Sequence, residues 1–273
     1  MSFDTLGPGG LDYLPCRYGT SKILFRGPKR SLTGPYVAFF GGTTTYGKYV
    51  ETPFPALVEQ DLPLTCVNFG CVNGGIDLYA GDPMLRDMAI GAKVTVLQVT
   101  SPRNMSNRFY KVHPRRNDRF IEASALLRTI YREVDFAEFN FCNHMLQRLH
   151  LVSPDRFDAV LDELRTAWLA RMRLVLSQIP GKTILLWASD HAPGDEATDF
   201  DADPAFVTRG MLAEIEPLVT RLVSVVASDE ARAAGTEGMV FPEMDATSAG
   251  TMLGPMAHRE IADALLDALK DMT

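Results

Sequence analysis

Cysteine and long apolar runs are both scarce in this sequence. The 273 residues include four cysteines, with no CxxC pair and no spacing typical of metal ligands. We therefore expect no metal site and interpret the cysteines as small buried side chains. No apolar run approaches the roughly 20 residues that span a bilayer. The first residues show no basic segment followed by an apolar stretch, so we expect no signal peptide. These absences favour a reduced, cytoplasmic setting.

Positive charge is also in short supply. Lysine and arginine number 27 against 34 acidic residues, which gives a formal net charge of −7. This balance argues against general affinity for nucleic acids or membrane surfaces, although it leaves room for a local basic site. Apolar residues make up 46% of the chain and charged residues 22%, which is ordinary for a globular protein.

Strands and helices are predicted to alternate from Tyr36 onward. Five apolar runs are interpreted as core strands, at 36–40, 64–69, 93–100, 182–188 and 221–227. Helical segments separate them, which favours an α/β fold with a doubly wound, mostly parallel five-stranded sheet covered on both faces. In such sheets ligands bind at the carboxyl ends of the strands. We therefore expect one functional crevice at that edge.

The chain is divided into an N-terminal extension, residues 1–35, and a single α/β domain, residues 36–273. The extension is rich in glycine, proline and charge, and its run 22–26 is predicted to form an edge strand. Within the domain, apolar residues recur at three- and four-residue steps and predict a helical insertion over about 118–179. The apolar content of this insertion permits a homodimer through it.

The first predicted strand runs into Gly41-Gly-Thr-Thr-Thr-Tyr-Gly47. Hydroxyl groups at such a strand-to-helix turn occupy the place where α/β proteins put nucleophiles and anion-binding groups. The loop is similar to the first block of SGNH/GDSL hydrolases, whose strand ends in Gly-Asp-Ser or Gly-Gly-Ser. The resemblance puts Thr43 in the place of the serine nucleophile. The alternative is that Thr43 only caps the following helix.

Two further segments resemble blocks that build the oxyanion hole of that family. In Val67-Asn-Phe-Gly-Cys-Val-Asn-Gly-Gly75, Gly70 is the match for the glycine whose N–H binds the oxyanion, unless these glycines only permit a tight turn. Asn104, or alternatively Asn107, fills the place of the family's asparagine after the central strand. The resemblance therefore implies an oxyanion site made by Gly70 and Asn104.

The last resembling segment lies directly before the final predicted helix. His258 matches the family's histidine base by position, but Pro255 replaces the aspartate that would precede it by three residues. A histidine base needs an acceptor that fixes its tautomer. Asp245 in the same loop, or a backbone carbonyl, is expected to supply one. A helix-start histidine without chemical function is the alternative interpretation.

A cationic cluster follows the central strand. Six of the 27 cations fall between residues 103 and 119. Because arginine binds two oxygens of a carboxylate, sulfate or phosphate, the cluster predicts an anionic ligand. A surface loop that pairs with Asp118 and Glu122 is the alternative. The four arginines expected to bind the ligand are Arg103, Arg108, Arg115 and Arg116.

These resemblances imply an SGNH-like ester hydrolase or acyl transferase that needs no cofactor and acts on a small or carbohydrate-linked, anionic substrate. The alternative is a transferase or non-catalytic module that binds sulfate, phosphate or a nucleotide. The whole chain also resembles an uncharacterised bacterial family that shares segments such as Val112-His-Pro-Arg-Arg-Asn-Asp-Arg-Phe120. Asp190-His191, at another strand end, is interpreted as a polar turn.

Overall fold

The fold is organised around one parallel β-sheet. The computed structural model describes residues 9–273. Five strands lie in the order β2-β1-β3-β6-β7, and each neighbouring pair is parallel. Their bounds are β1 Tyr36–Phe40, β2 Thr65–Asn68, β3 Val94–Gln98, β6 Lys182–Ser189 and β7 Arg221–Val226. The predicted doubly wound α/β sheet is confirmed.

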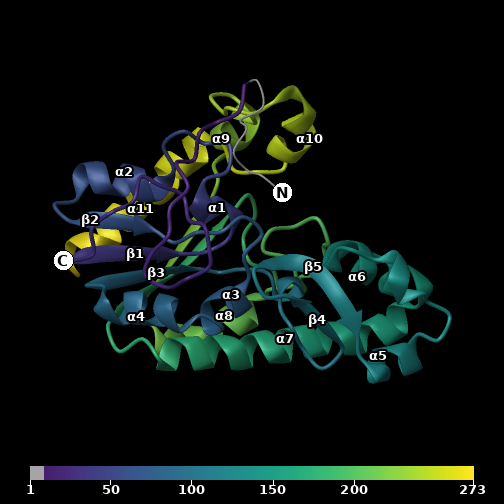
Figure 1. Cartoon of the computed structure of the whole chain (residues 1–273). Coiled ribbons are helices and arrows are strands. Elements are labelled where there is room, and N and C mark those ends of the chain that lie inside the picture. Colours follow the sequence, from purple (N-terminus) through teal and green to yellow (C-terminus); the bar gives the residue numbers. More distant parts are fainter. Residues whose placement is uncertain (1–8) are drawn as a thin grey trace.

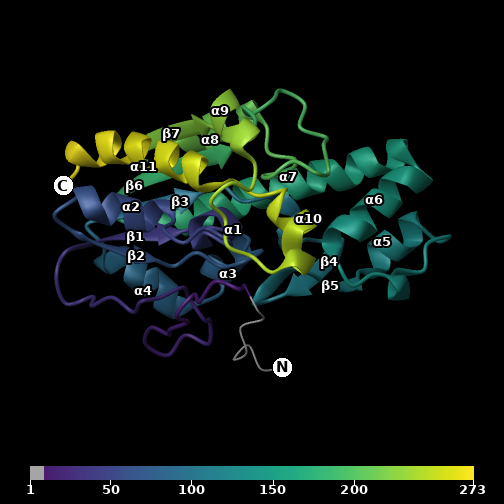
Figure 2. The same cartoon turned by 90° about the horizontal axis from the view of Figure 1, so that it is seen from above.

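Helices cover both faces of the sheet (Figures 1 and 2). One face packs against α2 Phe54–Asp61 and α11 Pro255–Lys270. The other packs against α3 Ile76–Ala80, α4 Pro83–Gly91, α7 Pro154–Ser177 and α8 Arg209–Ile215. Because both faces are covered, successive residues of β1 enter opposite cores, and all five are buried. Within residues 9–273, no helix combines the length and apolar character that a membrane crossing requires.

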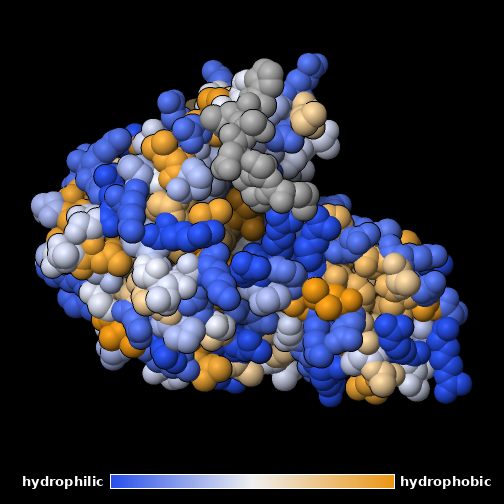
Figure 3. Space-filling view, viewed as in Figure 1, coloured by the Kyte–Doolittle hydropathy of each residue, from blue (hydrophilic) through white to orange (hydrophobic). Residues whose placement is uncertain are grey.

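The insertion forms a lateral lobe with a hydrophobic core of its own. It contains β4 Tyr110–His113, β5 Arg116–Ala123, α5 Ala125–Ile130 and α6 Cys142–Val152, packed on the first half of α7. Figure 3 shows hydrophobic residues gathered on this lobe amid hydrophilic surface. The prediction of helix from residue 118 was wrong, because 116–123 is a strand of an antiparallel hairpin.

The misassigned strand has an irregular register. The pairing of β4 with β5 shifts on either side of Val112, as in a β-bulge. Asn117, Phe120 and Ala123 are consequently the buried residues of β5, three positions apart. A bulge adds a residue to the two-residue alternation of a strand. The resulting spacing imitates the apolar period of a helix.

The N-terminal segment packs onto the main core. Tyr18 and Phe25 are buried, and their rings lie 5.1 and 5.4 Å from the ring of Phe69. Phe25 forms an isolated antiparallel bridge with Cys16. The predicted edge strand over 22–26 was therefore wrong, because this run pairs within its own segment and the sheet holds five other strands.

Candidate functional site

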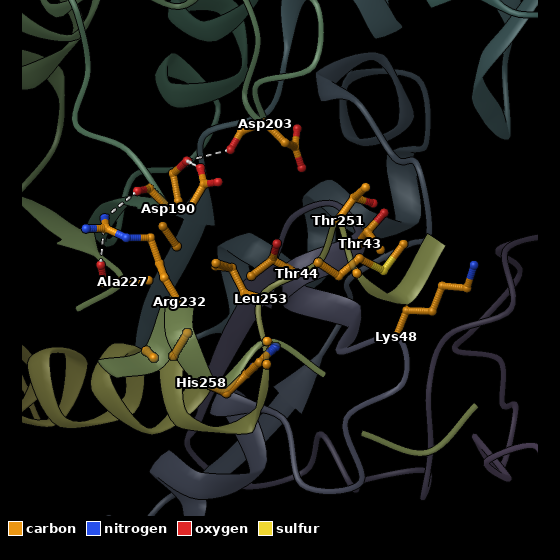
Figure 4. Close-up of a pocket in the computed structure, with 18 of the residues that line it drawn as sticks. Thr43, Thr44, Lys48, Asp190, Asp203, Ala227, Arg232, Thr251, Leu253 and His258 are labelled. Atoms are coloured by element: carbon orange, nitrogen blue, oxygen red, sulfur yellow. Dashed lines mark hydrogen bonds between the residues drawn. The ribbon is translucent and has the colours of Figure 1, made fainter. Parts of the chain in front are cut away.

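A cavity of about 340 Å³ opens at the carboxyl ends of the strands. Short helices adjoin it, namely α1 Thr43–Tyr46, α9 Asp229–Ala234 and α10 Ala246–Ala249. Side chains enter it from segments far apart in the sequence (Figure 4). We call Thr43, Thr44 and His258 the donor wall, and Ser189, Asp190 and Asp203 the carboxylate wall. The remaining lining residues are Lys48, Asn73, Arg103, Ala188, Asp201, Ala227, Ala231, Arg232, Gly235, Gly250, Thr251, Met252, Leu253, Gly254 and Ala257.

The turn that carries Thr43 is held from the central strand. Gln98 Oε1, at the end of β3, accepts hydrogen bonds from the Gly42 N–H (3.0 Å) and from the Thr45 hydroxyl (2.6 Å). A side chain at Gly41 would stand 2.2 Å from Thr45 Oγ1, so this position requires glycine. Gly47, with a φ of +73°, ends the single turn of α1 in the left-handed conformation.

Thr43 is bonded to an asparagine that the sequence interpretation did not include. Thr43 Oγ1 accepts the Asn73 N–H at 2.9 Å and donates to Asn73 Oδ1 at 3.3 Å. Asn73 Nδ2 in turn donates to Asp118 Oδ2 at 3.1 Å. An amide oxygen is too weak a base to take the proton of a hydroxyl nucleophile. Thr43 therefore reaches the predicted crevice, but its hydroxyl has no activating base as a partner.

His258 occupies the first turn of α11 and is almost completely buried. Its Nδ1 accepts the N–H of Phe54, the first residue of α2, at 3.1 Å. Burial, together with the nearby charge of Arg26, lowers the pKa of His258 to about 3. A neutral imidazole that accepts at Nδ1 carries its proton on Nε2. His258 thus presents a proton to the cavity in this geometry, which does not favour the predicted role of general base.

The predicted orienting residue of His258 is likewise replaced. Asp245 lies directly before α10, outside the cavity lining, and forms no hydrogen bond with His258. The backbone N–H of Phe54 fixes the imidazole instead. Because a donor has taken the place of an acceptor, the tautomer is the opposite of the one that a catalytic base requires.

The two residues predicted for the oxyanion site do not line the cavity. The Gly70 N–H donates to Asn68 Oδ1 at 2.8 Å and is therefore occupied. A Cβ at Gly70 would lie 2.3 Å from Tyr46 N, so glycine is needed there for close packing against α1. Asn104 ends a short 3-10 helix, Pro102–Asn104, and its carbonyl packs against Gly75. Neither residue is placed to form the predicted oxyanion site within the cavity lining.

Of the four predicted anion-binding arginines, one reaches the cavity. Arg103 lines it while donating to the Phe200 carbonyl at 2.6 Å. Arg108 pairs with Glu163 at 2.8 Å, and Arg115 is exposed on the turn between β4 and β5. Arg116 belongs to β5 and lies outside the lining. Proximity in the sequence therefore does not bring the four arginines together in the cavity lining.

The carboxylate wall follows β6 and includes Asp190, the first residue of the pair that was interpreted as a polar turn. His191 Nδ1 lies 2.8 Å from Asp190 Oδ1 and 2.7 Å from Ser189 Oγ, while the Ser189 hydroxyl donates to the Asp203 carbonyl at 2.7 Å. Burial raises the pKa of Asp190, but hydrogen bonds from His191 and Ser189 outweigh it and lower the pKa overall. Because a carboxylate only accepts, Nδ1 of His191 carries a proton, and in the neutral ring Nε2 then keeps a lone pair.

Asp203 is a cavity residue that the sequence interpretation missed. Figure 4 shows its carboxylate pointing away from Asp190, toward the side of the cavity that holds Thr251 and Thr43. The residue is exposed to solvent by surface area, although the protein packed around it raises its pKa against the opposing influence of Arg103 and His191. The signal in the sequence that pointed to Asp203 was its position in a polar loop, fourteen residues beyond Ser189.

The cavity as a whole is close to electrically balanced. Its lining contains three cations, Lys48, Arg103 and Arg232, and three carboxylates. Arg232 is engaged by Asp229 and by two carbonyls. Among residues 9–273, no group of three or more His, Cys, Asp or Glu side chains could hold a metal ion. The arrangement suits an oxygen-rich ligand that both donates and accepts hydrogen bonds.

Comparison with solved structures returns lipases and esterases at low identity. A lipase from a goat rumen metagenome is 11% identical with a TM-score of 0.48, covering 86% of this chain and 97% of its own. An acetyl-xylooligosaccharide esterase from Geobacillus is 12% identical with a TM-score of 0.40, and the match covers 88% of this chain and 94% of the esterase. A protein described as a GDSL-like lipase from Parabacteroides merdae is 12% identical with a TM-score of 0.38, and the match covers 87% of this chain and 100% of that protein.

No curated protein matches the sequence. One family model does match, over residues 1–273, and its description is a domain of unknown function, DUF6473. This agrees with the expectation of an uncharacterised family. Since the match spans the whole chain, the protein belongs to the DUF6473 family.

Proposed function

We propose that this protein is an ester-directed hydrolase or acyl transferase that works by general-base catalysis, with Asp203 as the base and His258 as a donor to the carbonyl oxygen. The observation that carries the proposal is the hydrogen bond from the Phe54 N–H to His258 Nδ1, at 3.1 Å. It leaves Nε2–H as the polar group that a cavity-lining imidazole offers to a ligand. A neutral donor suits an oxygen that gains charge in the transition state.

Opposite environments of the two groups support this division of roles. The pKa of Asp203 is raised, which makes its carboxylate a better proton acceptor, and the pKa of His258 is lowered, which keeps it neutral. Titratable groups whose environments push their pKa values apart are a recurrent sign of acid–base work. In Figure 4 the two side chains enter the cavity from different sides.

The proposed reaction uses no covalent intermediate. The Asp203 carboxylate takes a proton from water, or from an acceptor alcohol. At the same time the oxygen of that water or alcohol attacks the ester carbonyl carbon. The carbonyl oxygen becomes an oxyanion that accepts the His258 Nε2–H. When the tetrahedral intermediate collapses, the C–O bond to the leaving alcohol breaks and protonated Asp203 returns the proton to that alcohol. Thr43 and Thr44 contribute hydroxyl contacts, and Arg103 and Lys48 are available for an anionic group of the substrate.

The experiment is hydrolysis of a panel of acetyl to butyryl esters, including acetylated sugars, by the wild type and two variants. Asp203→Asn keeps the size of the side chain but removes the base. Asp201→Asn changes a second carboxylate of the same cavity and serves as the matched control. We expect loss of turnover in the first variant alone. Equal activity of the two variants on any hydrolysed ester would refute the role of Asp203.

A second candidate function is ligand binding without catalysis. It is favoured by the engagement of the Thr43 hydroxyl with Asn73, which gives that hydroxyl an amide partner in place of an activating base. Thermal shifts with sulfate, phosphate and nucleotides test it, because binding to the native state adds stability. Arg103→Met should abolish a shift, whereas Arg108→Met, outside the cavity, should retain it. An unhydrolysed ester panel together with such a shift would favour this candidate.

A further inference from the structure

Arg26 is a buried cation whose hydrogen bonds all go to main-chain carbonyls. The side chain comes from the N-terminal segment and is 7% exposed. Its Nη1 donates to the carbonyls of Tyr46 at 3.2 Å and Gly47 at 2.5 Å, and its Nη2 to the carbonyl of Glu51 at 2.7 Å. Burial lowers the pKa of the guanidinium, so its place carries a desolvation cost. The role of Arg26 is therefore to be sought in the main-chain segments that its three hydrogen bonds hold in place.

The first two carbonyls belong to the end of α1. A cation at the carboxyl end of a helical turn meets carbonyls that have no partner within the helix. Thr43 and Thr44 begin the same turn and line the cavity. With a rise of about 1.5 Å per residue, the guanidinium stands only about one turn behind them. The position of α1 therefore depends on the N-terminal segment as well as on Gln98.

The third carbonyl, that of Glu51, lies in the chain segment that leads to the residue orienting His258. Glu51 belongs to the short connection between α1 and α2, and Phe54, three residues later, supplies the N–H that fixes His258. The charge of Arg26 also lies near enough to His258 to help keep the imidazole neutral. One side chain thus holds the turn that carries the hydroxyls and the connection that leads to the N–H orienting the imidazole.

We propose that Arg26 is a positioning residue, which reaches the cavity through α1 and the 47–53 connection and fixes where Thr43, Thr44 and His258 stand. It touches no substrate. The inference makes the N-terminal segment part of the site's framework, and it rests on the proposed function only for its kinetic readout.

The test compares Arg26→Lys with Arg30→Lys. Lysine keeps the charge but cannot spread donors over three carbonyls. Arg30 belongs to the same segment and pairs with Glu59, away from α1, so its replacement is the matched control. We expect both variants to fold by circular dichroism. In Arg26→Lys alone, the amides of α1 and of residues 47–54 should exchange hydrogen at least tenfold faster. The ring ¹⁵N signals of His258 should also lose the pattern of a fixed Nε2–H tautomer.

On an ester that the wild type hydrolyses, kcat of Arg26→Lys should fall at least tenfold with little change in KM. If the wild type hydrolyses no ester, the exchange and ¹⁵N measurements still decide, so failure of the proposed function is separable from failure of this one. Matching exchange rates and His258 signals in the two lysine variants would overturn the proposal. A purely structural role predicts a lower melting temperature for Arg26→Lys without those local changes.

Discussion

The two walls of the cavity use histidine in opposite ways. On the donor wall, His258 Nδ1 accepts a backbone N–H, so the ring presents a proton at Nε2. Behind the carboxylate wall, His191 Nδ1 faces Asp190 and Ser189, so its Nε2 keeps a lone pair. His258 is almost completely buried, whereas 37% of the His191 side chain is exposed.

This difference shows that the partner of one ring nitrogen decides the chemistry of the other. A carboxylate behind the ring produces an acceptor at Nε2, and a helix N–H behind it produces a donor. A histidine in the position of a catalytic base can therefore present a donor in place of an acceptor without any change of residue type. The carboxylate wall, with Asp203 at its cavity end, becomes the place to seek the base.

The largest expected effect is that of Asp203→Asn. General-base catalysis contributes about 10²- to 10⁴-fold, so kcat should fall by that factor while substrate binding persists. Wild-type activity should decline as pH falls through the Asp203 pKa, which is raised above its usual value. Because the Asp203 side chain is exposed to solvent, removal of its charge in Asp203→Asn should change the melting temperature at pH 7 little.

Kinetics over pH 4–9, together with melting temperatures at pH 7, check this prediction. Asp201→Asn is the control for both measurements. A fully active Asp203→Asn variant, or a pH profile of activity that stays flat below neutrality, would rule out Asp203 as the base. His191 would then be the next candidate, since its Nε2 has a lone pair.

The second expected effect is acid sensitivity that originates from His258. Its pKa is about 3 in the folded protein and 6.5 without perturbation. The unfolded chain thus binds a proton between these values that the native state refuses, so stability is complete above about pH 6.5 and falls as pH decreases toward 3. The full difference corresponds to about 5 kcal/mol of unfolding free energy.

Urea unfolding at pH 7 and pH 4 measures this term. The loss of stability should be smaller in His258→Phe than in the wild type, because the phenylalanine cannot bind the proton. Equal pH dependence of the wild type and His258→Phe would mean that His258 is not held neutral.

The third expected effect is on catalysis by His258→Phe. The ring can keep its stacking against Phe54, whose centroid lies 5.8 Å from that of His258, but the Nε2–H is lost. Removal of one oxyanion donor costs about 10²- to 10³-fold in kcat. Turnover of a hydrolysed ester by this variant, compared with Thr44→Val at 20 °C, gives the measurement. A loss no larger than that of Thr44→Val would remove the donor role.

The fold followed from the sequence because its determinants are local and repetitive. Apolar runs such as Tyr36–Phe40 and Lys182–Ser189 are continuous, as strands covered on both faces must be. The failures lie where tertiary contacts compete with the pattern. The bulge between β4 and β5 gave residues 116–123 a false helical period, and the run 22–26 joined Cys16 instead of a sheet edge.

The site was predictable in position but not in chemistry. Thr43, His258 and Arg103 do line the cavity, because parallel strands end at one edge. Their roles depend on partners distant in sequence, such as Phe54, which lies 204 positions from His258. No spacing rule links these residues. Asp203 was missed for the same reason, since its raised pKa arises from the protein that folds around it.

The smallest expected effect is that of Thr43→Ser, and it separates the two accounts of the hydroxyl loop. If Thr43 were a nucleophile hindered by its methyl group, serine would accelerate turnover. In the proposed mechanism Thr43 is a contact whose Oγ1 stays bonded to Asn73, so kcat should change little, because serine keeps that hydroxyl. Thr43→Val removes the hydroxyl, and it should raise KM by a larger factor than it lowers kcat. Steady-state kinetics of both variants decide the matter, with Thr44→Ser as the control. A tenfold gain in Thr43→Ser, or a covalent acyl adduct on it detected by mass spectrometry, would restore the nucleophile to the donor wall and remove the need for Asp203 as the base.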